Sequence, residues 1–241
     1  MDRMIFLSMA GAKTTMQRQD ALANNLANVS TPGFRAALQG TVPVPVGGTG
    51  SRVYSVETTI GYDASPGAIT STGRNLDVAA KGNAWLTVQA LDGTEAYTRG
   101  GSLDVSSDGT LTTRSGLPVM GDGGPLQVPP NTAISIGGDG VISAKSADGK
   151  SATIGKLKLV TPETSATLTR GEDGLFRAQN GDLSADDGAR VQDGALEGSN
   201  VNPVEAMISM ISAARQFEAQ MKLIQTAEAN EKAASQLLSA N

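Results

Sequence analysis

An Asp-Gly dipeptide occurs eight times in the middle of this chain of 241 residues, and this repetition limits the fold more than any other feature. Asp-Gly is a leading signal for the tight turn of a β-hairpin, because glycine accepts the positive φ that such turns need. Short alternating apolar runs lie beside the turns. Residues 76–196 are therefore predicted to form an all-β domain, either a meander or a partly open barrel. The eight aspartates are Asp92, Asp108, Asp122, Asp139, Asp148, Asp173, Asp187 and Asp193.

The N-terminal end has the opposite character and is predicted to form one long helix. Residues 3–29 contain no proline and one glycine. Apolar or small residues follow one another in steps of four and three, with Gln19 filling one gap, which is the heptad spacing of a helix–helix seam. We expect the helix to stop before Phe34, because Pro32 disfavours helical geometry at Thr31 and Pro32-Gly33 suits the centre of a type II turn. The seam comprises Ile5, Met9, Ala12, Met16, Ala23 and Leu26.

The C-terminal end carries a strong helix start followed by a second seam. Asn202 is a good N-cap, Pro203 fits the first helical position, and Glu205 sits where a capping box needs it. No glycine or further proline interrupts residues 204–239. A second long helix is therefore predicted from Pro203, with a seam of Met207, Met210, Ala214, Phe217, Met221 and Ile224.

These elements predict an α+β protein in which long N- and C-terminal helices pack together in a coiled-coil-like manner, with a central all-β domain. The expected divisions are an N-terminal helix at 1–34, an extended connector at 35–74, the β domain at 75–196 and a C-terminal helix at 197–241. The connector is expected because residues 42–48 are rich in Val, Pro and Gly.

Composition excludes several kinds of chemistry. The chain has no His and no Cys, so it cannot form a Ser-His-Asp or Cys-His nucleophile pair, or a zinc site of imidazole and thiolate ligands. Its net charge of −5 disfavours a nucleic-acid binder, which needs a basic surface. Aromatic residues make up only 3%, so we expect a core of small aliphatic residues and Met. The early apolar stretch at 4–7 is too short for a cleavable signal peptide or a membrane span.

Three local motifs are candidates for a ligand-binding or metal-binding site. Gly149-Lys150-Ser151 resembles the end of a phosphate-binding loop, but Ala144 stands where that motif needs glycine, so a hairpin turn is favoured. The acidic pairs Asp186-Asp187 and Glu172-Asp173 each contain an Asp-Gly turn, which favours solvated turn tips over a weak calcium site. The prediction is therefore no catalytic residue, no cofactor and no metal.

The terminal helices leave two readings open. Physics alone favours a helical hairpin within one chain, or two helices that cover a sheet. The full-length seams and the poor helix formers Asn24, Asn25 and Asn28 favour instead a bundle shared between subunits, in which buried amides can fix register. Solvated asparagines are the simpler explanation of those three residues.

At residues 23–34 the chain carries the string Ala-Asn-Asn-Leu-Ala-Asn-Val-Ser-Thr-Pro-Gly-Phe, which resembles the N-terminal signature of the bacterial flagellar rod and hook proteins. Residues 75–86, 97–102, 108–111 and 121–129 resemble the central segment of that family, and residues 197–203 with 215–218 resemble its C-terminal signature. Within the family the chain is most similar to the proximal rod proteins, and the distal rod proteins are the alternative. It departs from the usual pattern at Ala84-Trp85-Leu86 and in the short segment 40–66.

The resemblance implies a structural subunit of the flagellar basal-body rod, which carries motor torque through the periplasm, and no enzyme. It implies homo- and hetero-oligomers with other rod proteins, export through the flagellar type III apparatus without a cleavable signal peptide, and no nucleic acid or membrane span. The residues expected to serve subunit assembly are Ile5, Met9, Met16, Leu22, Asn24, Asn25, Leu26, Asn28, Pro32, Gly33, Phe34, Asn202, Met207, Ile211, Phe217, Met221 and Ile224.

The sequence leaves open two alternatives from other functional classes, an enzyme and a binding module. A carboxylate-dependent enzyme of the cell envelope needs two acids that converge in a cleft, with at least one raised pKa. A binding module or adhesin on the β domain would keep its activity without residues 1–34, whereas a rod subunit would fail to assemble.

Overall fold

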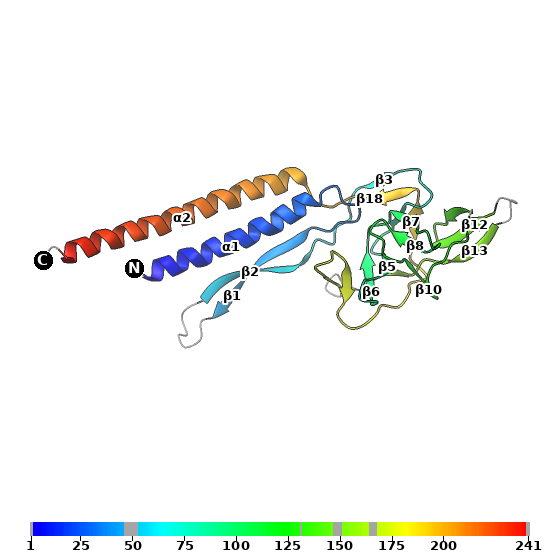
Figure 1. Ribbon diagram of the computed structural model, residues 1–241, viewed down its shortest axis with the longest axis horizontal. Coiled ribbons are helices and arrows are strands. Elements are labelled where there is room, and N and C mark those ends of the chain that lie inside the picture. Colours follow the sequence, from blue (N-terminus) through cyan, green and yellow to red (C-terminus); the bar gives the residue numbers. More distant parts are fainter. Residues whose placement is uncertain (1, 46–52, 131, 147–150, 164–167, 240–241) are drawn as a thin grey trace. The chain divides into compact units, whose positions relative to one another are not determined.

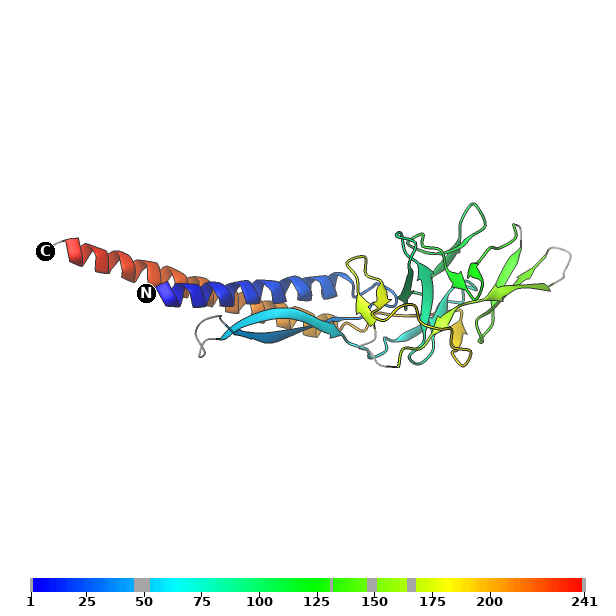
Figure 2. The same cartoon turned by 90° about the horizontal axis from the view of Figure 1, so that it is seen from below.

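The computed structural model describes residues 2–45, 53–130, 132–146, 151–163 and 168–239. The chain divides into two compact units (Figures 1 and 2). The first comprises Met1–Asn28, Ala37–Ile60 and Val201–Asn241, and the second comprises Val29–Ala36 and Gly61–Asn200.

The first unit contains the two helices and most of a two-stranded sheet. Helix α1 (Asp2–Ala27) and helix α2 (Pro203–Ser239) pack together, which confirms that the terminal helices pair. Strands β1 (Ala37–Pro45) and β2 (Val53–Tyr62) pair beside α1, and β1 contacts that helix (Figure 2). Residues 35–74 thus contain paired strands where a plain extended connector was expected, because alternating Val residues favour pairing over an isolated extended chain.

The second unit is built from short antiparallel strands. Its largest sheet has the order β14-β5-β6-β16-β15, so it is not a simple meander. The strands of this sheet are β5 (Trp85–Gln89), β6 (Glu95–Thr98), β14 (Leu159–Val160), β15 (Leu168–Arg170) and β16 (Phe176–Ala178). A three-stranded sheet contains β11 (Ala133–Ile136), β12 (Val141–Lys145) and β13 (Ser151–Lys156). Four strand pairs complete the unit: β3 (Ile69–Ser71) with β18 (Ala195–Glu197), β4 (Val78–Ala80) with β17 (Val191–Asp193), β7 (Leu103–Val105) with β8 (Leu111–Thr113), and β9 (Met120–Gly121) with β10 (Gly124–Pro125).

Five of the predicted Asp-Gly hairpin turns are confirmed. The turns at Asp92, Asp108, Asp122, Asp139 and Asp173 each join two paired strands or the two arms of a hydrogen-bonded hairpin. Asp193-Gly194 is instead a corner, because β17 and β18 pair with different strands. Asp187-Gly188 lies in a loop turn closed by the Ala189 N–H and the Asp186 carbonyl. The predicted turn at Asp148-Gly149 lies outside the described residues, and so do Gly149 and Lys150 of the Gly-Lys-Ser motif.

The core of the second unit consists of aliphatic residues plus one aromatic cluster. Val78, Leu86, Leu103 and Leu111 are among the fully buried members. Tyr62, Trp85, Tyr97 and Phe176 form the second cluster with Val160 and Leu168. The expectation that Met would fill the core was wrong: no Met is among the buried core residues that the structure describes, and four lie exposed on the helices.

Candidate subunit-assembly surface

The two helices meet through small side chains. Ala12 and Thr15 of α1 and Ala213 of α2 are each 8% exposed or less. A Cβ added to Gly11 would lie only 2.3 Å from Oε1 of Gln220, so the helices approach each other closely at this point. The seam predicted from heptad spacing is therefore only partly the contact within the chain: Ala12 faces inward, whereas Met9 and Met16 are exposed.

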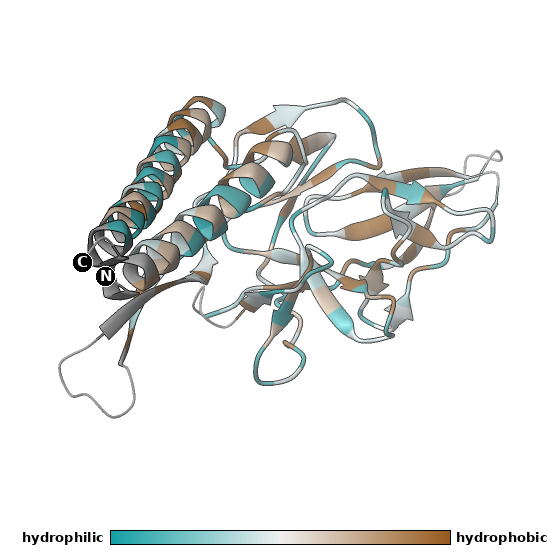
Figure 3. Ribbon diagram, turned by 60° about the vertical axis from the view of Figure 1, so that its left-hand side comes forward, coloured by the Kyte–Doolittle hydropathy of each residue, from teal (hydrophilic) through white to brown (hydrophobic). Residues whose placement is uncertain are grey.

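Large apolar side chains lie on the outer faces of both helices. On α2, Val204, Met207, Ile208 and Ile211 follow the i, i+3, i+4, i+7 spacing of one helix face, and each is between 51% and 64% exposed. Single exposed apolar residues are ordinary on protein surfaces, but a stripe of this kind indicates a contact surface. Figure 3 shows apolar residues recurring along both helices.

The structure distributes the predicted helix residues over three environments, and Asn25 is the buried member among the described side chains. Exposed side chains are those of Met9, Met16, Asn24, Asn202, Met207, Ile211 and Met221, and partly buried ones are those of Leu22, Leu26, Asn28, Phe217 and Ile224. The side chain of Ile5 lies outside the described part. Sequence reasoning missed four exposed apolar residues of the helices: Phe6, Val204, Ile208 and Leu223. The i+3 and i+4 spacing of Val204 and Ile208 to Met207 and Ile211 could have revealed those two.

Asn25 makes contacts within its own chain. It is 8% exposed, its Nδ2 donates to the Ala37 carbonyl at 3.1 Å, and its Oδ1 accepts from the Ala37 N–H at 2.9 Å. This pair fastens the last turns of α1 to the start of β1. The neighbouring Asn28 donates from Nδ2 to the Asn24 carbonyl at 2.9 Å and closes the helix end.

Replacing Asn25 by alanine is expected to free the Ala37 backbone. Loss of both hydrogen bonds leaves a partly buried N–H and C=O without their partner, at a cost of about 1–3 kcal/mol. Amide hydrogen exchange at Ala37 should then be at least about fivefold faster, because exchange reports local opening. Asn24→Ala, at an exposed position one residue earlier, is the control, and equal exchange rates in the two variants would contradict this role.

Residues 31–34 form the expected type II turn. The Phe34 N–H donates to the Thr31 carbonyl at 3.3 Å, and Gly33 has a φ of +72°. Pro32 is exposed, whereas Phe34 is 7% exposed with the Arg170 guanidinium 4.3 Å from its ring centroid. The buried part of this turn thus packs inside the second unit.

Asn202 is the N-cap of α2. Its Oδ1 accepts from the N–H groups of Val204 at 3.1 Å and Glu205 at 3.3 Å. The helix start predicted from the sequence is confirmed.

A buried cluster of three charges joins distant parts of the chain. The Glu197 carboxylate lies 2.7 Å from Arg35 Nη2, and Arg99 Nε donates to its Oε2 at 2.8 Å. All three side chains are 3% exposed or less. Burial lowers the pKa of the Arg99 guanidinium, and the Glu197 carboxylate opposes that shift. Sequence reasoning did not find this cluster, because 98 residues separate Arg99 from Glu197.

Arg99 and Glu197 also bind backbone groups. Arg99 donates to the carbonyls of Ala80, Gly82 and Ala84, and Glu197 accepts from the Gly67 N–H at 2.9 Å. The cluster therefore stabilises the fold of the second unit.

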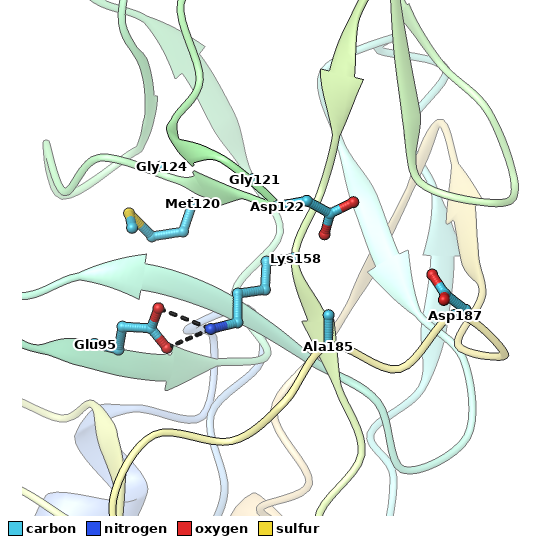
Figure 4. A pocket seen from close by; sticks show the side chains of 8 residues that line it. All are labelled: Glu95, Met120, Gly121, Asp122, Gly124, Lys158, Ala185 and Asp187. Atoms are coloured by element: carbon cyan, nitrogen blue, oxygen red, sulfur yellow. Dashed lines mark hydrogen bonds and ion pairs between the residues drawn. The ribbon is translucent and has the colours of Figure 1, made fainter.

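A polar pocket of about 420 Å³ is the candidate for a carboxylate-dependent catalytic site (Figure 4). Glu95 accepts from Lys158 Nζ at 2.7 and 2.8 Å, and Asp122 and Asp187 also line the pocket. The Lys156 ammonium, 2.8 Å from Asp187, lowers the pKa of that carboxyl. Among the described residues no group of three His, Cys, Asp or Glu side chains could hold a metal ion.

The chain thus combines a pair of helices that carries an exposed apolar stripe with a β domain that contains a buried cluster of charges. In the described part of the chain, neither helix is long and apolar enough to cross a membrane.

Three family models match successive parts of the chain. Residues 7–35 match the flagella basal body rod protein model, residues 79–144 match the D1 domain of flagellar hook protein FlgE/F/G, and residues 192–237 match the C-terminal model of flagellar basal body rod FlgEFG protein.

Curated relatives match over nearly the whole length. The chain is 46% identical to flagellar basal-body rod protein FlgF of Salmonella typhimurium and 45% identical to FlgF of Escherichia coli, with 99% of each chain covered. It is 33% identical to flagellar basal-body rod protein FlgG of Bacillus subtilis, over 94% of this chain and 95% of that protein. The chain belongs to the flagellar basal-body rod protein family and is FlgF-like within it.

Proposed function

We infer that this chain is a structural subunit of the bacterial flagellar basal-body rod. The observation that carries this inference is the apolar stripe on α2, which is exposed on a helix pair whose own contact uses small residues. Full-length identity to FlgF proteins supports the same function.

In the assembled rod, α1 and α2 pack with the helices of neighbouring subunits into a coiled-coil-like bundle, and this helical assembly transmits motor torque. Burial of Met207, Ile208 and Ile211 against neighbours favours assembly because it removes apolar area from water. Met side chains adapt to imperfect contacts, which suits interfaces between subunits of different sequence.

A proximal position in the rod is favoured over a distal one. Identity to the two enterobacterial FlgF proteins is 45–46%, compared with 33% to the FlgG protein. The partners are then other rod proteins, including proximal neighbours and the distal rod protein, in homo- and hetero-oligomers.

The site of action is the periplasmic rod of the basal body, reached through the flagellar type III export apparatus. Passage as an unfolded chain is compatible with the lack of Cys, because no disulfide has to be broken.

The carboxylate-dependent enzyme has less support. That function requires an acid with a raised pKa in a cleft. Each carboxyl with a resolved shift among the described residues has a lowered pKa, and hydrogen bonds are the largest cause: Asp63, Asp92, Asp108, Asp173, Asp186 and Asp187.

Charge on the exposed stripe is expected to block assembly without harming the fold. Met207→Asp combined with Ile211→Asp places two carboxylates where the bundle would bury them, at positions that are 51% and 55% exposed in the free chain. We expect incorporation into isolated basal bodies and motility to fall more than tenfold in cells that lack their own copy.

Gln216→Asp is the matched control, because Gln216 is exposed on the same helix and is neither three nor four positions from any residue of the stripe. Circular dichroism of each purified variant checks that the fold is kept. Normal incorporation of the double variant would refute the assembly role of this stripe.

A further inference from the structure

Five turns of the second unit share one geometry. In each, the first residue accepts at its carbonyl from the N–H of a glycine three positions on, and donates its own N–H to the carbonyl four positions on. The five glycines have φ values from 78° to 84°. The turns begin at Ala90, Ser106, Thr113, Gly137 and Gly171.

Because the geometry is shared, the residues at the second position of these turns can be compared directly. They are Leu91, Ser107, Arg114, Gly138 and Glu172, and all are exposed. Leu91 is the only large apolar one of the five, and at 96% exposure it is the most exposed large hydrophobic residue in the described part of the chain. The turn does not require leucine there, since four other residues serve the same backbone.

A pocket of about 370 Å³ in the same unit has the complementary character. Its apolar wall includes Pro32, Leu117 and Leu175, and Arg114 lies at its edge. The guanidinium of Arg114 makes no hydrogen bond or ion pair with the described residues. Pro32, which is exposed, and Gly100, which is half-buried, belong to two different family-like strings and both line this pocket.

We propose that in the rod the turn bearing Leu91 of one copy inserts into this pocket of the next copy. Leu91 packs on Pro32, Leu117 and Leu175 of the neighbour. This proposal rests on the proposed function and adds a contact between β domains to the contacts of the helices.

Charge complementarity favours a second copy of this chain as the occupant. Asp92, next to Leu91 and with a side chain 55% exposed, then lies opposite the Arg114 of the neighbour. Among the described residues of its own chain, the one cation paired with Asp92 is Arg177, with Nη2 at 3.6 Å. Leu91 and the pocket are on different turns, and in a head-to-tail arrangement their contact can repeat along a helical assembly.

Disulfide trapping tests the contact with little background, because the chain contains no Cys. Full-length Leu91→Cys and Ser115→Cys chains, with Ser115 lining the pocket, are co-expressed in cells that lack their own copy. Basal bodies are isolated and treated with an oxidant. We expect a cross-linked dimer when both variants are present, at least tenfold above either variant alone.

Ser107→Cys with Ser115→Cys is the matched control, because Ser107 occupies the same position in a sister turn. A second measurement adds Arg114→Glu to the Ser115→Cys chain. The amount of cross-linked dimer should fall severalfold, because the new carboxylate repels Asp92 of the other copy. Incorporation into basal bodies without a cross-link above the control would overturn this contact and leave the rod function standing. If isolated basal bodies contain neither the two variants nor the unmodified chain, the rod function is overturned, and so is the contact that rests on it.

Discussion

Replacing Gly33 by alanine is expected to destabilise the second unit by at least about 3 kcal/mol. A Cβ at this position would lie 2.2 Å from the Arg99 carbonyl carbon and 2.3 Å from the Gly100 nitrogen, and both atoms belong to the backbone. Gly33 also has a φ of +72°, which disfavours any residue with a side chain. Neither strain can be relieved by rotating a side chain, so the turn or the backbone at Arg99 and Gly100 must move.

Gly73→Ala separates the two causes. Gly73 has nearly the same φ, +70°, but an added Cβ would meet nothing within 4 Å. This variant should lose only about 1–2 kcal/mol from backbone strain. Urea unfolding followed by the fluorescence of Trp85, the only Trp and 2% exposed, measures both variants. Equal losses would show that close backbone contact at Gly33 has no energetic weight.

Glu197→Gln is expected to cost about 3–5 kcal/mol, because it leaves two buried guanidinium groups without their counter-charge. The carboxylate accepts from Arg35, Arg99 and the Gly67 N–H, whereas a glutamine amide has one oxygen and would turn an NH₂ group toward one of these donors. The shape of the side chain is conserved, so the loss reports charge and hydrogen bonding. The same urea unfolding experiment measures it.

Glu95→Gln is the matched control. Among the described residues, the one cation paired with Glu95 is Lys158. The two side chains are 19% and 17% exposed, so water partly screens the pair. We expect a loss of about 1 kcal/mol or less for this variant, and less again at high salt. If the two variants unfold at the same urea concentration, the buried cluster contributes no more than a surface ion pair.

The two helices show how far the sequence could predict the candidate site. Heptad spacing located both helices and marked apolar faces, but it could not say what covers those faces. The structure places Ala12, Thr15 and Ala213 between the helices and leaves Met207 and Ile211 exposed. Spacing alone cannot tell which apolar residues are buried between the helices and which stay exposed. The buried residues are those that allow the two helices to approach each other most closely.

The asparagines of α1 give a second example. Three amides near a helix end suggested register contacts between subunits. Within its own chain Asn25 pairs with the Ala37 backbone twelve residues later, and sequence spacing could not reveal this partner because it depends on where β1 lies.

The sequence by itself determined the features whose hydrogen bonds close within a few residues: the Asp-Gly hairpins, the turn at residues 31–34 and the N-cap at Asn202. Only the tertiary structure decided the partners that are far apart in the chain. Arg35, Arg99 and Glu197 have no pattern in common, and only the tertiary fold brings both guanidinium groups within 3 Å of the Glu197 carboxylate. The same holds for the helix surface, since a side chain is left for a neighbouring subunit only when the fold of its own chain does not cover it.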